Sequence, residues 1–202
     1  MSQALFASQS AQLARSGYRN CLLALLHPSN TTYQKLGQQR ASVWHAYMLM
    51  FASSLIGSMI ESLAPIGSQL VAQGSLDTLL LAMIPIAAVI AVCSLVAFAW
   101  CAHIVARSFK GSGSYAQLTY VWAAISAPLL IAASILDQIP AARILLVVFY
   151  LYWLAQYAIS IRAVNGLSWV KTTATMLLAL LLLGSVWLGV AFLVARSSIL
   201  LP

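Results

Sequence analysis

Long apolar runs separated by short polar turns dominate the chain from residue 43 onward. The run 79–102, for example, contains no charged residue. About 20 predominantly apolar residues cross a bilayer as a helix, because the hydrocarbon core is about 30 Å thick and each helical residue rises about 1.5 Å. The pattern predicts an all-α, polytopic integral membrane protein. Its bundle of five transmembrane helices is expected at 43–63, 79–106, 117–136, 141–164 and 170–195.

Composition excludes an ordinary soluble domain. Of the 202 residues, 62% are hydrophobic and only 6% are charged, whereas soluble domains carry about 25% charged residues. We expect one membrane domain over 43–202, preceded by a cytoplasmic amphipathic segment over 1–42. Arg15 and Arg19 are spaced one helical turn apart among leucines, which is typical of a helix lying in the headgroup layer. The alternative is a soluble tail.

The positive charge is distributed in a way that indicates membrane orientation. The net charge is +7, but the basic residues stand at the ends of the spans and do not cluster to line a nucleic-acid groove. We therefore expect no nucleic-acid partner. One side would carry Arg15, Arg19, Lys35, Arg40, Arg107, Lys110, Arg162 and Lys171; the other would carry Arg143 and Arg196 with Glu61, Asp77 and Asp137.

This bias places the N-terminus in the cytoplasm and the C-terminus outside or in a lumen. Four of the basic residues are candidates for interfacial contact with lipid: Arg15, Arg19, Arg107 and Lys110.

Small residues and a proline predict how the helices pack. Ser53 and Gly57 are spaced one turn apart on the first span and permit close approach of another helix. Pro128 lies at mid-depth in the third span, where proline removes a backbone hydrogen bond and costs about 3 kcal/mol unless neighbours compensate. Ser126 is one such neighbour. We expect a kinked third helix in the bundle interior.

Few residues suggest chemistry. Glu61 is near the end of the first span and Gln156 lies in the aromatic fourth span, so the two are candidates for a transport path. Glu61 can also simply reach the interface. The sequence contains no CxxC pair, no catalytic constellation and no GxxxxGK[ST] loop. We therefore expect no enzyme activity, no catalytic residue, no cofactor and no bound metal.

Several motifs together resemble a known family. They are the turn FKGSGSYAQL, the proline motif SAPLL, the aromatic fourth span, and the turn RAVNGLS, with HPSNTTYQKL before the first span. The stretch from residue 109 to 180 resembles the Yip (Ypt-interacting protein) domain family of five-span membrane proteins. Eukaryotic members bind lipidated Rab GTPases through a cytoplasmic N-terminal region. With only 1–42 before its first span, this chain resembles the short bacterial-type members, which implies a bacterial inner membrane, or an endomembrane if eukaryotic.

The leading hypothesis is a non-enzymatic membrane scaffold or interaction protein that organises the membrane or partner proteins. Two alternatives stay open: an accessory subunit of a larger membrane complex, and a small transporter or channel. The expected partners are membrane lipids and a membrane-protein partner or a second copy of the chain.

Overall fold

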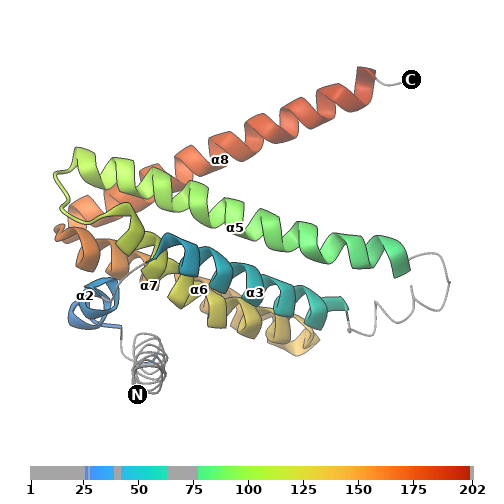
Figure 1. Ribbon diagram of the computed structural model, residues 1–202, viewed down its shortest axis with the longest axis horizontal. Helices are drawn as coiled ribbons and strands as arrows, with labels where there is room; N and C mark the ends of the chain where they lie inside the picture. Colours follow the sequence, from blue (N-terminus) through green and yellow to red (C-terminus); the bar gives the residue numbers. More distant parts are fainter. Residues whose placement is uncertain (1–25, 27, 39–41, 63–76, 201–202) are drawn as a thin grey trace, which may run out of the picture.

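The computed structural model describes residues 26, 28–38, 42–62 and 77–200. Five helices in these ranges are long and apolar enough to cross a membrane, which confirms the expected all-α, five-span fold (Figure 1). Every observed span overlaps its predicted counterpart. The elements are α2 (Asn30–Gln38), α3 (Val43–Ser62), α5 (Asp77–Ser108), α6 (Tyr115–Asp137), the 3-10 turn η1 (Pro140–Ala142), α7 (Arg143–Asn165) and α8 (Trp169–Leu200).

Polar residues in the turns define where several helices begin and end. The Ser29 hydroxyl accepts a hydrogen bond from the N–H of Thr32 at 3.1 Å, which caps α2. Ser114 and Gln117 form a capping box at the start of α6, with reciprocal bonds of 3.2 and 3.1 Å. α7 ends at Gly166 in the left-handed conformation, with φ 66°. These caps explain why short turns separate the spans.

Successive spans run in opposite directions, so alternate turns meet at one end of the bundle. Figure 1 shows α2, the end of α5, the end of α7 and the start of α8 together at this end. We call it the basic end, because these helices and the turn after α5 carry Lys35, Arg107, Lys110, Arg162 and Lys171.

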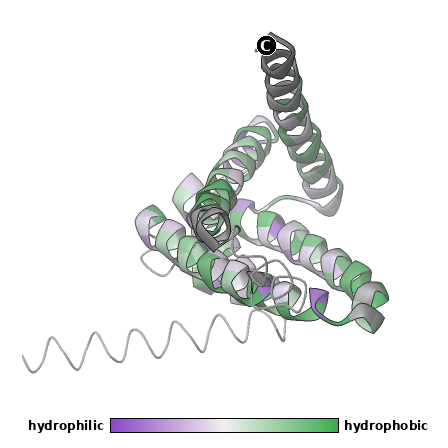
Figure 2. Cartoon of the chain, turned by 90° about the vertical axis from the view of Figure 1, so that its right-hand side faces the viewer, coloured by the Kyte–Doolittle hydropathy of each residue, from purple (hydrophilic) through white to green (hydrophobic). Residues whose placement is uncertain are grey.

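α6 lies at the centre of the bundle. It contacts α3 most extensively and also packs against α5, α7 and α2. Accordingly, 67% of its span is buried, against 17% to 28% for the other four spans. Figure 2 shows that hydrophobic residues predominate along the long helices, and many large hydrophobic side chains on these helices are exposed. That surface composition suits helices surrounded by lipid.

α8 packs against the bundle near its beginning. Among the α8 side chains whose burial the structure describes (169–189 and 192), the buried ones are Thr172, Thr175, Met176 and Ala179, in the first three turns, and α5 is the main neighbour of this helix. Farther along, α8 diverges from α5 (Figure 1). A Cβ atom built at Gly184 or Gly189 would meet nothing within 4 Å.

Candidate functional site

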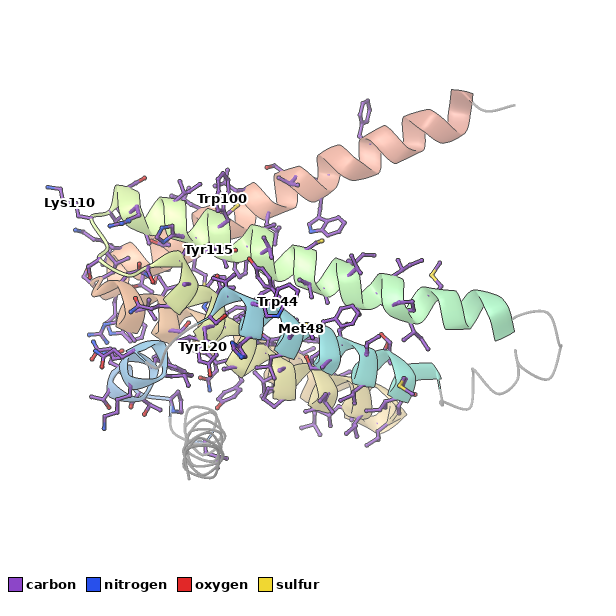
Figure 3. The ribbon with its side chains drawn as sticks, in the orientation of Figure 1. Trp44, Met48, Trp100, Lys110, Tyr115 and Tyr120 are labelled. Carbon is purple, nitrogen blue, oxygen red and sulfur yellow. The ribbon has the colours of Figure 1, made fainter. Side chains whose placement is uncertain are left out.

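A lysine in a left-handed backbone conformation lies in the turn after α5. Lys110 has φ 64°. Its N–H donates to the carbonyl of Arg107 at 2.9 Å, and the N–H of Gly111 donates to the carbonyl of Ala106 at 2.8 Å. These paired bonds form a Schellman motif, in which glycine usually holds the left-handed position, because a side chain there costs roughly 1–2 kcal/mol. The exposed Lys110 side chain extends from the end of the bundle (Figure 3).

The glycines beside Lys110 allow this turn to contact the turn that follows α7. A Cβ atom at Gly113 would lie 2.7 Å from the Val164 carbonyl oxygen and 2.8 Å from Asn165 Oδ1. The N–H of Ser112 donates to the Asn165 carbonyl at 3.2 Å. A Cβ atom at Gly111 would lie 3.0 Å from Asn165 Cβ. Gly111 and Gly113 therefore both permit the close backbone approach, and the two turns form one packed unit.

α2 is also part of the basic end. Tyr33 and Leu36 are fully buried, and α2 packs against α6 and α7. A Cβ atom built at Gly37 would lie 3.7 Å from the Val121 side chain and 3.8 Å from the Val164 side chain, which is ordinary van der Waals contact. Burial, with a smaller contribution from Tyr152, raises the pKa of the Tyr33 phenol far above its usual range, so this ring stays neutral.

No acidic residue of the chain lies at the basic end. The sequence contains three acidic residues. Glu61 is next to the end of α3, Asp77 begins α5 and Asp137 ends α6, so all of them lie at the opposite ends of these helices. Lys35, Arg107, Lys110 and Lys171 are exposed, and the Arg162 guanidinium lies 4.6 Å above the centre of the Trp169 ring.

Three exposed tryptophans lie toward the basic end of the bundle. Trp44 is the second residue of α3, Trp169 is the first residue of α8, and Trp100 lies in the last third of α5. Their side chains are 68%, 51% and 58% exposed, and Figure 3 shows Trp44 and Trp100 on their helices. Exposed tryptophans at helix ends are typical of the boundary between membrane and water.

Deeper in the bundle, α6 and α7 are joined by a network of polar and aromatic side chains. Trp122 Nε1 donates to Ser160 Oγ at 2.7 Å, and Trp153 Nε1 donates to Ser126 Oγ at 3.3 Å. The Ser126 and Tyr157 hydroxyls also form a hydrogen bond. The Trp122 ring clusters with those of Phe98 and Tyr157, whose centroids are 4.7 and 4.6 Å from it and 5.7 Å from each other. These interior polar groups bind one another.

This arrangement of helices and turns can be compared with known proteins. The Yip1 domain family model matches residues 22–191. The chain belongs to the Yip1 domain family. The match extends from before α2 into the second half of α8 and confirms the resemblance seen in the sequence motifs. Neither a curated protein nor a solved structure gives a significant match.

In this Yip1-family fold, Gly57 and Ser53 lie on the α3 face that meets α6. A Cβ atom at Gly57 would be 2.8 Å from Ser134 Oγ. Ser53 is buried, and its hydroxyl donates to the Met50 carbonyl within its own helix at 3.0 Å. Gly57 therefore lies where the two most extensively packed helices approach closely.

Pro128 lies within α6, which is helical without interruption from Tyr115 to Asp137. The Pro128 ring is exposed, whereas Ser126 is fully buried. The helix lies in the bundle interior as expected, but the proline itself points out of it. Proline has no N–H to donate. Because Pro128 faces outward, no polar group of the core has to compensate for the missing hydrogen bond.

The transport candidates are not brought together. The Ser134 hydroxyl donates to Glu61 Oε1 at 2.8 Å between α6 and α3, whereas Gln156 is fully buried in α7. Glu61 is the second-to-last residue of α3, at the end opposite the basic end, whereas Gln156 lies in the middle of α7. Among the described residues, no group of three or more His, Cys, Asp or Glu side chains could hold a metal ion.

Two features of the site were missing from the predictions made on sequence. Asn165 was expected only as a turn residue, but its buried side chain contacts Gly111 and Gly113. Trp122 was not singled out, although an indole N–H inside an apolar span requires a partner and is a usable signal. Arg15, Arg19 and Arg40, together with the proposed amphipathic helix, lie outside the described residues.

Proposed function

We propose that this Yip1-family chain is a non-enzymatic membrane scaffold or interaction protein whose basic end organises partner proteins. The observation that carries the proposal is the docking of the two turns, with Gly113 against Val164 and Asn165. Docked turns present Lys110 and its neighbours outward from a fixed frame. A preorganised surface binds more tightly, because less conformational freedom is lost on association.

The interior of the bundle supports the same proposal. The network of Trp122, Ser126 and Tyr157 is joined by hydrogen bonds and ring contacts within the bundle. Polar groups that bind one another hold helices together. The positive-inside bias supports a cytoplasmic location for the basic end, with the C-terminus outside. The resemblance to short bacterial-type members supports a bacterial inner membrane.

Site-specific photo-crosslinking in native membranes tests this function. A photoreactive amino acid is placed at Ser112, which is exposed in the docked turn, or at Leu188, which is exposed on the diverging part of α8. We expect discrete protein adducts from Ser112 that disappear when Arg107 and Lys110 are both changed to Glu. Identical adducts from both positions, or none from Ser112, would contradict the proposal.

A further inference from the structure

We propose that the basic end binds the phosphate groups of anionic phospholipids, with Lys110 as a preorganised contact. This interaction surface concerns the lipid surface itself and goes beyond the proposed binding of partner proteins.

Basic and acidic residues are separated between the two ends of the bundle. The cations of the basic end stand on four helices and one turn, and all three acidic residues of the chain lie at the far ends of α3, α5 and α6. Exposed ammonium and guanidinium groups without internal carboxylates draw their counter-charge from outside the protein. Clusters of Lys and Arg next to membrane helices attract anionic lipid.

The exposed tryptophans indicate how deep the cations lie relative to the membrane boundary. Trp44 and Trp169 occupy the first turns of α3 and α8 and are more than half exposed. Tryptophan prefers the headgroup level, so the membrane boundary passes close to these residues. Lys110 lies two residues beyond α5 and Lys171 is the third residue of α8, which places both ammonium groups within side-chain reach of lipid phosphates.

The arrangement of the cations around the bundle suits lipid headgroups, which can bind them alongside the partner protein proposed at the docked turns. The cations are not gathered on one helix; they are distributed over the ends of α2, α5, α7 and α8. Lipid headgroups surround the whole circumference of a bundle at this level, so a ring of separate cations is matched by separate phosphates. Arg162 is steadied by the Trp169 ring at 4.6 Å, a contact between a cation and an interfacial aromatic residue.

The backbone at Lys110 adds an independent observation. The left-handed position of a Schellman motif favours glycine, yet this chain has a lysine there with φ 64°. Backbone strain retained at one residue often accompanies function. Here the conformation directs an exposed ammonium away from the end of the bundle, as Figure 3 shows.

Lipid selectivity of the purified, reconstituted full chain tests the inference. The chain is placed in phosphatidylcholine vesicles, and quenching of its tryptophan fluorescence by brominated phosphatidylglycerol is compared with quenching by brominated phosphatidylcholine. The ratio of the two apparent affinities is measured at low and high salt. We expect a preference for the anionic lipid that falls with salt, because exposed charges are screened.

Lys110→Gly is the decisive variant, because glycine suits the backbone conformation and the fold is retained. We expect the preference to fall by on the order of threefold for this change and to vanish in a triple variant with Arg107→Gln and Lys171→Gln. Ala141→Glu is the control matched to Lys110→Gly. Both substitutions lower the net charge by one, but Ala141 is exposed at the opposite end of the bundle. It should leave the preference unchanged.

An unchanged lipid preference in the triple variant would overturn the inference, as would an equal loss in Ala141→Glu. Inorganic phosphate added at constant ionic strength should not compete; full competition would show that free phosphate, not lipid, is the ligand. If changing Arg107 and Lys110 to Glu removes the Ser112 adducts but leaves the lipid preference unchanged, these cations bind a protein and not a lipid. The failure of the lipid inference is thus distinguishable from failure of the proposed function.

Discussion

α6 and α8 have the same mean hydropathy over their spans, but 67% of the α6 span is buried and only 22% of the α8 span. Both patterns correctly predict a membrane helix. The difference between them lies in their neighbours, since α6 contacts α2, α3, α5 and α7, whereas α8 contacts mainly α5 and, less extensively, α7. Hydropathy therefore locates a helix in the membrane without locating it in the bundle.

The reason lies in the physics of helix association within lipid. Moving a leucine from lipid to a protein interior gains little, because both surroundings are apolar. Close packing and hydrogen bonds decide which helices associate. α6 has six alanines among its 23 residues and a buried Trp122, whereas α8 from residue 180 to 200 has seven leucines and only two alanines. Three pairs of matched substitutions test this explanation.

The largest effect is expected for Trp122→Ala. The change removes a fully buried indole, its hydrogen bond to Ser160 and its ring contacts with Phe98 and Tyr157. We expect a loss of about 3 kcal/mol in the free energy of unfolding, measured by denaturant titration in mixed micelles. The control is Trp187→Ala on α8, where the ring is 45% exposed. Equal losses from both helices would refute the explanation.

A smaller effect is expected when a side chain is added at the α3–α6 contact. In Gly57→Leu, the new Cβ would lie 2.8 Å from Ser134 Oγ, and separating the helices should destabilise the bundle by about 2 kcal/mol. The same micelle titration measures the loss. Gly184→Leu on α8 is the control, because that site has no atom within 4 Å. A tolerated leucine at residue 57 would show that the two helices do not pack closely.

The smallest effect is expected from a single hydroxyl. Ser126→Ala removes the contacts with Tyr157 and Trp153 between α6 and α7, at a cost of about 1 kcal/mol. In α8, the Ser185 hydroxyl donates to the Leu182 carbonyl of its own helix at 2.7 Å, so Ser185→Ala should cost less in the same unfolding assay. The reverse order would show that bonds between helices do not stabilise α6.

Much of the basic end could be predicted, but its assembly could not. Lys110 and the turn containing Asn165 and Gly166 are both visible as basic turns, and their placement on the same side follows from counting spans. The contact of Gly113 with Val164 and Asn165 depends on the positions of helices that are distant in the chain. No local pattern reports that the two turns touch, or that Lys110 adopts φ 64°.

By itself, the sequence determined the number of spans, their approximate ends and the family, because bilayer thickness and turn chemistry act on neighbouring residues. Only the tertiary structure decided that α6 is central, that Pro128 is exposed, and that Gly57 meets Ser134. These outcomes depend on which apolar surfaces pack together, and lipid and protein interiors are nearly equivalent surroundings for such surfaces. Small local differences in shape and hydrogen bonding then select the arrangement.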